Sequence, residues 1–284
     1  MNTKTCIIVS GPTAVGKTSY AIELALKHNT QIISADSRQC FKELYIGVAK
    51  PSVEQLEKVK HYFIDSHSIH EEVNAKIFEE YALKAVNEIF GKNDVAVMVG
   101  GTGLYIKAFA EGLDEIPGIN ESVRNEINDN YLEKGLDWLY NELKKNDPVF
   151  FAKGEMQNPQ RMLRALEVKV STGKSILEFH SKKKVKRDFE IKTVLLELPR
   201  GQLYNNINFR VDEMIANGLL KEAKSLYPYK SLNALQTVGY KELFDYFDGK
   251  ISLEKAVEEI KKNTRHYAKR QMTWFKKNIE NKNW

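Results

Sequence analysis

The sequence contains little cysteine and no long apolar run. Only Cys6 and Cys40 occur among its 284 residues. Their spacing matches neither a metal site nor a disulfide framework, so we expect a protein of a reducing compartment, the cytoplasm. No apolar segment approaches the ~20 residues that cross a bilayer. An apolar run begins a few residues after Met1, so we expect no signal peptide. These absences exclude a disulfide-rich secreted domain and a helical membrane protein.

Two signatures of nucleotide-hydrolysing proteins are also missing. The chain has no Asn-Lys-x-Asp motif for reading guanine, and the apolar segment 94–99 is followed by Gly100 where a Walker-B strand would end in Asp. These gaps weaken the ATPase and GTPase hypotheses but leave a kinase possible. The sequence also lacks a metal-ligand cluster, and we expect His61, Met98 and Trp138 to be packing residues.

A phosphate-binding loop is present near the start of the chain. A β-branched run at 7–9 leads into Gly11-x-x-x-x-Gly16-Lys17-Thr18, and an amphipathic segment follows. This strand–loop–helix context is what a P-loop requires. Its backbone N–H groups surround phosphate oxygens, the Lys17 ammonium adds charge, and the Thr18 hydroxyl can bind Mg²⁺. The sequence therefore predicts a diphosphate or triphosphate site made of Gly11, Pro12, Thr13, Ala14, Val15, Gly16, Lys17 and Thr18.

The order of apolar and amphipathic segments predicts an α/β fold. Strands are expected at 31–34, 61–65 and 94–99, and helices at 75–90 and from Leu104, an alternation typical of a parallel sheet. From 114 to about 188 the pattern is helical, and the apolar run 192–198 then indicates an interior strand. We therefore predict a P-loop NTPase-like parallel sheet flanked by helices (1–113 and 190–284) with an all-helical insertion domain (114–189).

Two further features of the predicted core favour a ligand site. Asp36 follows the second strand, where an acid can position a nucleophile or a Mg²⁺-bound water. Ser37, Arg38 and Gln39 add hydrogen-bonding groups, although a polar loop without function would look the same. Arg210 falls on the apolar side of a helix expected at 203–215, so its guanidinium needs an anion. That anion is either a diphosphate or a structural carboxylate.

Basic residues are concentrated in two segments. The net charge is only +5, yet residues 160–187 carry nine Lys or Arg against two acids, and residues 255–277 carry eight against two. Such segments indicate a large polyanion or a solvated lysine surface. Arg161 and Arg164, three apart and opposite an apolar face, suit nucleic-acid phosphates or are surface arginines. In the helix expected at 253–275, the apolar stripe including Tyr267 is expected in the core. The opposite side carries Lys262, Arg265, Lys269 and Lys276.

Taken together, these segments resemble the tRNA dimethylallyltransferase family over nearly the whole chain. The motifs of the first half are Gly11-Pro-Thr-Ala-Val-Gly-Lys-Thr18, Ser34-Ala-Asp-Ser-Arg-Gln39, Ile46-Gly-x-Ala-Lys-Pro51 and Gly100-Gly-Thr-Gly-Leu-Tyr105. Those of the second half are Asn158-Pro-Gln-Arg-x-x-Arg-Ala-Leu-Glu167, Arg210-Val-Asp212, Val238-Gly-Tyr-Lys-Glu242 and Thr264-Arg-x-Tyr-Ala-Lys-Arg-Gln-x-Thr-Trp-Phe275.

The resemblance implies transfer of a dimethylallyl group from dimethylallyl diphosphate to N6 of the adenine adjacent to the tRNA anticodon. It implies that Asp36 is the general base, that Thr102 and residues 37–39 hold the adenine, and that Lys17 and Arg210 stabilise the departing diphosphate with Mg²⁺ on Thr18. The catalytic residues expected on this basis are Asp36, Lys17, Thr102 and Arg210. The tRNA-binding residues expected are Asp36, Ser37, Arg38, Gln39, Thr102, Arg124, Gln160, Arg161, Met162, Leu163 and Arg164.

Two departures from the family pattern and three alternatives accompany this interpretation. Cys40-Phe41 stands where the family usually has Val-Tyr, which removes a hydroxyl, and the chain stops at Trp284, shorter than many relatives. The alternatives are an ATP-dependent small-molecule kinase, a prenyltransferase acting on free adenine nucleotides, and a non-catalytic RNA-binding module. We expect a monomer with tRNA and dimethylallyl diphosphate as partners and no membrane.

Overall fold

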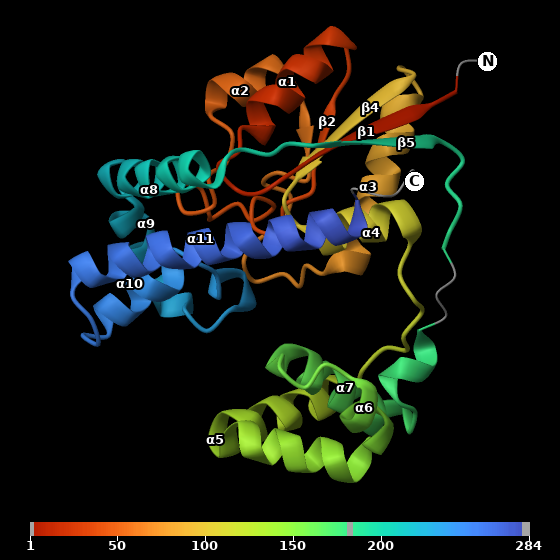
Figure 1. Cartoon of the computed structure of the whole chain (residues 1–284), viewed down its shortest axis with the longest axis vertical. Coiled ribbons are helices and arrows are strands. Elements are labelled where there is room, and N and C mark those ends of the chain that lie inside the picture. The colour runs from red at the N-terminus through yellow and green to blue at the C-terminus, as the bar shows by residue number, and fades with distance from the viewer. Residues whose placement is uncertain (1–2, 181–183, 280–284) are drawn as a thin grey trace. The chain divides into compact units, whose positions relative to one another are not determined.

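The chain folds into two compact units. The computed structural model describes residues 3–180 and 184–279. One unit, the core, comprises residues 1–112 and 185–284, and the other, the insertion, comprises residues 113–184 (Figure 1). The sequence placed these boundaries at 113/114 and 189/190. The difference at the second boundary has a structural cause described below.

A parallel sheet forms the centre of the core, as the sequence predicts. In the described residues it has five strands in the order β3-β2-β4-β1-β5. The prediction that residues 192–198 form an interior strand is wrong, because β5 pairs only with β1 and lies at the sheet edge. The strands are β1 (Thr5–Ser10), β2 (Ile32–Ser34), β3 (His61–Tyr62), β4 (Val95–Gly100) and β5 (Glu190–Leu195).

The strand register brings three loops to one edge of the sheet. Ser10 of β1 pairs with Gly100 of β4, and Ser34 of β2 pairs with Val99. The carboxyl ends of these three strands therefore lie at the same level. Ligands of parallel α/β sheets bind at this edge. The P-loop, the loop that begins at Asp36 and the Gly100–Gly103 turn all start here.

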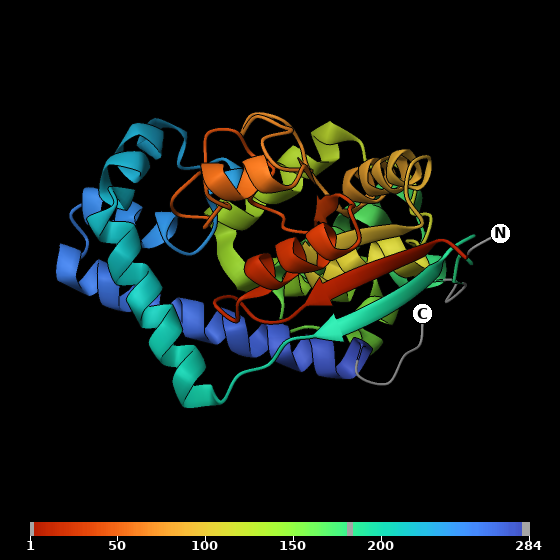
Figure 2. The same cartoon turned by 90° about the horizontal axis from the view of Figure 1, so that it is seen from above.

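Helices cover both faces of the sheet because each carries one apolar face. The helix α3 begins and ends where its periodicity predicts, at Ala75 and Phe90, and the Asn74 side chain caps its N-terminus. The long helix α11 packs along α8, α10 and α4 (Figure 2). The core helices are α1 (Lys17–Lys27), α2 (Val53–Lys58), α3 (Ala75–Phe90), α4 (Gly103–Glu111), α8 (Arg200–Ala216), α9 (Leu219–Leu226), α10 (Tyr240–Phe247) and α11 (Leu253–Asn278), with 3₁₀ turns η2 (Tyr227–Tyr229) and η3 (Asn233–Leu235).

The segment that returns from the insertion belongs to the core from Val185 onward. The Val185 N–H donates to the Glu111 carbonyl at 2.9 Å. The Arg187 guanidinium bonds the Glu79 carboxylate at 2.8 Å and the carbonyls of Ala108 and Phe109. The charge run 182–187 predicts a mobile link back to the core, and this prediction is wrong for residues 185–187, which are bonded to the core. Lys182 and Lys183 of that run lie outside the described residues.

The insertion is helical, as the sequence predicts. It also has a hydrophobic core of its own. Gly135 breaks α5 into two helical pieces with a φ of +74°. No strand occurs in its described residues, 113–180 and 184. Along the parts of the chain that the structure describes, no helix is both long and apolar enough to span a bilayer. The elements are α5 (Glu121–Asn146), α6 (Pro148–Lys153), α7 (Pro159–Thr172) and the 3₁₀ turn η1 (Ile176–Phe179).

Candidate active site

The P-loop joins β1 to α1 and wraps around the N-terminus of that helix. Gly11 adopts a φ of +146°, and a Cβ there would lie 2.6 Å from the Leu196 carbonyl oxygen. A side chain at this position would clash with the backbone that follows β5, so glycine is required. Gly16, at a φ of +98°, then starts α1. The first N–H groups of a helix lack intrahelical partners, so this turn presents them to an anion.

Lys17 is held inside the P-loop, and this position lowers the pKa of its ammonium group. Its Nζ donates to the Pro12 carbonyl at 2.7 Å. Burial lowers the pKa of Lys17 to about 8, the nearby Arg210 charge acts in the same direction, and the Asp36 carboxylate opposes it. An anion bound in the loop would raise this pKa again, because it stabilises the charged form. Lys17 is therefore a cation whose charge is matched to an anionic ligand.

Arg210 reaches the P-loop from α8. Its Nη1 donates to Thr13 Oγ1 at 3.4 Å, and burial lowers its pKa. One turn earlier, Asn206 Nδ2 donates to the Ala14 carbonyl at 3.2 Å. Within the described ranges, no carboxylate lies within ion-pair distance of Arg210. Of the two alternatives that the sequence left open, the structure therefore disfavours a structural carboxylate and favours a bound anion.

Asp36 faces the P-loop from the end of β2. Its Oδ1 accepts the backbone N–H groups of Arg38 at 2.9 Å and Gln39 at 3.2 Å. Its Oδ2 makes no hydrogen bond within the part of the chain that the structure describes, so this oxygen is available to a ligand. Thr102 lies beside it, because Thr102 Oγ1 accepts the Ser37 N–H at 3.1 Å. The loops that follow β2 and β4 are thereby joined at the site.

Gln39 uses its amide to hold the neighbouring loop. Its Nε2 donates to the carbonyls of Val48 at 3.2 Å and Ala49 at 3.0 Å, and its Oε1 accepts the Ser34 hydroxyl. Both ends of this amide are therefore bonded to protein. A direct contact of Gln39 with tRNA stays a prediction, and the structure gives the side chain a second role in shaping the wall of the site.

A cavity of about 290 Å³ unites these groups. It brings together the P-loop, Asp36 and Arg210, which the sequence selected separately. Its wall also includes His61 and Tyr267, which the sequence assigned to packing, and Gln271, which it did not select. The assignment of Tyr267 to the core is wrong, because the residue is 37% exposed and lines the cavity. Burial, followed by the nearby Asp36 charge, raises the pKa of Tyr267 to about 12.

The sequence signals for Tyr267 and Gln271 are the family motif Thr264–Phe275, which contains both residues, and their spacing on α11. Tyr267, Gln271 and Trp274 lie four and three residues apart, so they share one helix face. That face contacts the Gly101–Gly103 turn, because a Cβ on Gly101 would meet Gln271 and a Cβ on Gly103 would meet Trp274. Periodicity identifies the face but not its partner.

The Thr18 hydroxyl is a P-loop group that could hold a metal ion at the cavity. No group of three or more His, Cys, Asp or Glu side chains gathers as a metal site in residues 3–180 and 184–279. The Thr18 side chain lines the cavity beside Lys17. Mg²⁺ usually keeps several waters and binds through one or two protein oxygens plus substrate phosphates. One hydroxyl at the start of α1 fits that coordination chemistry, provided that a diphosphate is bound.

The insertion places its predicted tRNA-binding residues in different environments. Met162 and Leu163 are 0% and 4% exposed in the insertion core, so the expectation that their side chains contact tRNA is wrong. Gln160 is exposed. The three arginines are each paired with an acid: Arg161 with Glu155, and Arg124 and Arg164 with Glu167 at 3.8 and 3.3 Å.

The basic side of α11 is also largely paired within the core. Lys262 bonds Glu259 at 3.0 Å, Lys276 lies 3.5 Å from Glu197, and Arg265 Nη1 donates to Asn208. These partners reduce the positive surface that the sequence predicted. Exposed Lys269 lies on the same helix.

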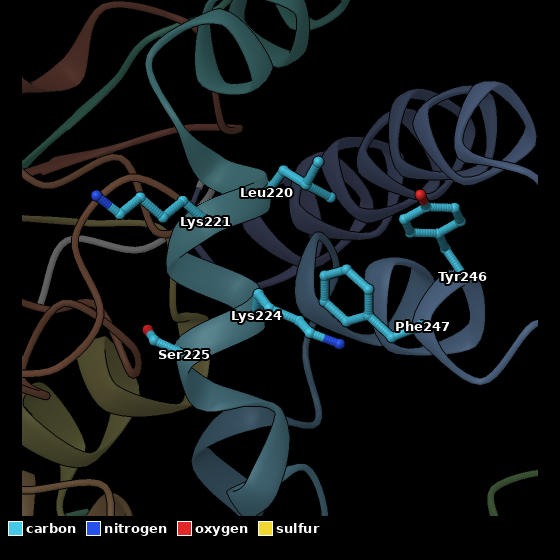
Figure 3. A pocket seen from close by; sticks show the side chains of 6 residues that line it. All are labelled: Leu220, Lys221, Lys224, Ser225, Tyr246 and Phe247. Atoms are coloured by element: carbon cyan, nitrogen blue, oxygen red, sulfur yellow. The ribbon is translucent and has the colours of Figure 1, made fainter.

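A second hollow of the core lies between α9 and α10, away from the predicted site residues. Figure 3 shows its lining, with Lys224 directed toward the Phe247 ring. The Lys224 ammonium lies 4.7 Å from that ring and 5.2 Å from the Tyr227 ring. The lining side chains are Leu220, Lys221, Lys224, Ser225, Tyr246 and Phe247. None of the candidate catalytic groups lies here, so the chemistry belongs to the P-loop cavity.

The chain resembles known proteins along most of its length. A family profile described as IPP transferase matches residues 39–278. The tRNA dimethylallyltransferase of Christiangramia forsetii is 50% identical over 274 residues, covering 96% of this chain and 91% of that protein. Its counterpart from Flavobacterium johnsoniae is 48% identical over 287 residues, with coverages of 99% and 93%.

Solved structures also resemble the chain. The full-length tRNA isopentenylpyrophosphate transferase of Bacillus halodurans has a TM-score of 0.70 and 35% identity, covering 97% of this chain and 88% of that one. A eukaryotic dimethylallyltransferase acting on tRNA has a TM-score of 0.78 and 29% identity, with coverages of 96% and 70%.

Proposed function

This chain belongs to the tRNA dimethylallyltransferase family and is a prenyltransferase that acts on tRNA; we propose that it takes the dimethylallyl group from dimethylallyl diphosphate, attaches it to N6 of the adenine adjacent to the anticodon, and releases diphosphate. The observation that carries this proposal is the composition of one cavity. Lys17 and Arg210 lie on its phosphate-binding side, and the Asp36 carboxylate faces them across the same space.

The P-loop side suits the leaving group. When the bond between the allylic carbon and oxygen breaks, negative charge develops on the diphosphate. Preorganised donors that face this charge lower the barrier. The P-loop N–H groups, the Lys17 ammonium and the Arg210 guanidinium are such donors. Arg210 has no competing carboxylate within the described residues, so its charge can act on the ligand.

The Asp36 side suits the nucleophile. The lone pair of the adenine N6 is delocalised into the ring, so N6 attacks the allylic carbon effectively only as it loses a proton. A general base that takes this proton contributes about 10²–10⁴-fold. Asp36 can accept it on Oδ2, while Oδ1 stays bonded to the N–H groups of Arg38 and Gln39. Thr102 is next to this carboxylate through Ser37 and can orient the adenine.

Mg²⁺ is the cofactor that we propose for the diphosphate. The Thr18 hydroxyl and the phosphate oxygens would hold it, and when bound it would neutralise part of the leaving-group charge. Without a carboxylate cluster in the described residues, the ion would enter with the diphosphate. This predicts that Mg²⁺ binding depends on donor binding.

The tRNA itself requires a larger surface than the cavity. The target adenine must leave its stack to reach Asp36. We propose that exposed arginines of the insertion bind anticodon stem-loop phosphates, with Arg161 the most exposed at 66% of its side chain. Phosphate contacts of this kind fix the RNA without reading its sequence. Because both cysteines are buried free thiols and the substrate is tRNA, we further propose a cytoplasmic protein, acting as a monomer.

Incubation with labelled dimethylallyl diphosphate and Mg²⁺ tests the proposal. Parallel reactions contain tRNA, AMP, or ATP with candidate small-molecule acceptors. We expect label in tRNA, recovered after digestion as an N6-prenylated adenosine, and no ATP consumption. Label in AMP alone would support the free-nucleotide prenyltransferase instead. ATP turnover without prenylated tRNA would support the kinase and overturn the proposal.

A further inference from the structure

Helix α11 connects the two halves of the reaction site through one side chain, Gln271. This residue is 7% exposed. Its Oε1 accepts the Thr13 N–H of the P-loop at 2.8 Å, and its Nε2 donates to the Gly101 carbonyl at 2.9 Å. Gly101 immediately precedes Thr102. A single amide therefore bonds the loop that holds the leaving group and the turn that holds the nucleophile.

The two loops that the Gln271 amide bonds also make hydrogen bonds to other residues of the site. Thr13 also accepts a hydrogen bond from Arg210 on its hydroxyl, and Thr102 accepts the Ser37 N–H beside Asp36. The Gln271 bonds therefore link the Arg210 side of the cavity to the Asp36 side. Both loops are irregular backbone, which can shift more than the strands that they follow.

The surroundings of Gln271 keep it in this bridging position. Neighbouring Ala268 on α11 is buried with Ala14 of the P-loop, and Trp274 packs against Gly103. A Cβ on Gly101 would lie 2.3 Å from Gln271 Nε2, while its next neighbours would be 3.5 Å away or more. The turn therefore approaches the amide closely because residue 101 has no side chain.

We infer that Gln271 is a positioning residue that fixes the distance between the allylic carbon of the bound diphosphate and the N6 of the extruded adenine. The inference rests on the proposed function. Attack at carbon needs the two reacting atoms about 3–3.5 Å apart and aligned, and a displacement near 1 Å can cost about 10²-fold in rate. Loss of the bridge would let the two loops move separately, with each substrate still bound by its own loop.

The replacement Gln271→Met tests this, since it preserves length and removes both hydrogen bonds. We expect kcat to fall about 10- to 100-fold. The KM values for donor and tRNA, and the Kd for inorganic diphosphate, should change less than about threefold, since their contacts remain. Asn263→Ala is the matched control. It removes another amide bond of α11, from Asn263 Nδ2 to Glu242 at 2.7 Å, and should leave kcat within about twofold.

A double-mutant cycle separates positioning from folding. Gly101→Ala should also lower kcat, because the added methyl group displaces Gln271. In the Gln271→Ala background the side-chain amide that would clash is absent, so Gly101→Ala should lower kcat little further. The losses in kcat from the two substitutions should therefore be non-additive. Melting temperatures of all variants identify any that fail to fold, and the cycle is evaluated on folded proteins.

The outcomes distinguish this inference from the proposed function. If the wild-type protein does not prenylate tRNA, the proposed function fails. If the wild-type protein is active and Gln271→Met keeps kcat within twofold, the positioning role is wrong. A loss that appears only in KM, or fully additive losses from Gly101→Ala and Gln271→Ala, would also overturn it.

Discussion

Donor binding should weaken as the pH rises above 8, because the P-loop lysine loses its proton there. Burial lowers the pKa of Lys17 to about 8 in the free protein. A bound diphosphate favours the charged ammonium and raises this pKa. Binding is therefore linked to the uptake of a proton once the pH exceeds 8. Because the pKa of the free protein is the lower one, affinity for the donor is nearly complete at pH 7 and falls as the pH rises through 8.

The expected size follows from the same pKa. If only the charged form of Lys17 binds well, the Kd rises about tenfold between pH 7 and pH 9, which corresponds to ~1.4 kcal/mol. Dimethylallyl diphosphate is a suitable ligand without tRNA, because the last ionisation of an alkylated phosphate has a pKa of about 6 and is largely complete at pH 7. Two other titratable side chains of the cavity do not interfere, because burial raises the pKa of Tyr267 to about 12 and lowers the pKa of His61 below its ordinary value.

Titration calorimetry at several pH values measures both the Kd and the proton uptake. Buffers with different ionisation enthalpies reveal the uptake as a difference in apparent heat. The variant Lys17→Met should bind more weakly at every pH and lose the dependence between pH 7 and pH 9. A wild-type Kd that stays constant across this range, or a dependence that persists in Lys17→Met, would refute the reasoning.

Three further predictions concern the base, the core and the insertion. Asp36→Asn should lower kcat about 10²–10⁴-fold with little change in donor Kd, measured in single-turnover reactions; full activity would remove the base assignment. Arg187→Met removes the hydrogen-bonded cation from the buried Glu79 carboxylate, which keeps the Lys76 ammonium at 3.7 Å, and should destabilise the protein by about 3 kcal/mol in urea unfolding. Lys192→Met, at an exposed pair, should leave the midpoint unchanged, and equal midpoints for the two variants would contradict this. Arg161→Gln should reduce the slope of log K for tRNA against log salt by about one, and an unchanged slope would exclude a phosphate contact there.

The local sequence pattern was sufficient to predict the helices, strands and loop that hold the catalytic groups. The helix α3 has the bounds that its periodicity indicates, and the glycine loop lies between β1 and α1. The apolar run of β5, by contrast, led to the prediction of an interior strand. Its position at the edge depends on which strands pair beside it, and no local signal contains that information.

The parts of the site that sequence reasoning missed depend on long-range contacts. Gln271 bonds Thr13 across 258 residues and Gly101 across 170. Tyr267 has the spacing of an apolar stripe, yet it faces the cavity and not the core. Met162 and Leu163 show the converse, because a motif suggested tRNA contact while their apolar character placed them inside the insertion. For these two residues the apolar pattern, and not the motif, predicted where the side chains lie.

The most direct test of the central claim is to observe the new bond itself. Dimethylallyl diphosphate labelled with ¹³C at its allylic carbon is incubated with tRNA that carries ¹⁵N at the adenine N6 positions, and the product nucleosides are examined by NMR. The proposed reaction predicts a one-bond ¹³C–¹⁵N coupling in the nucleoside from the position adjacent to the anticodon. Product with the label on another atom, or label confined to free nucleotide or diphosphate hydrolysis products, would contradict it.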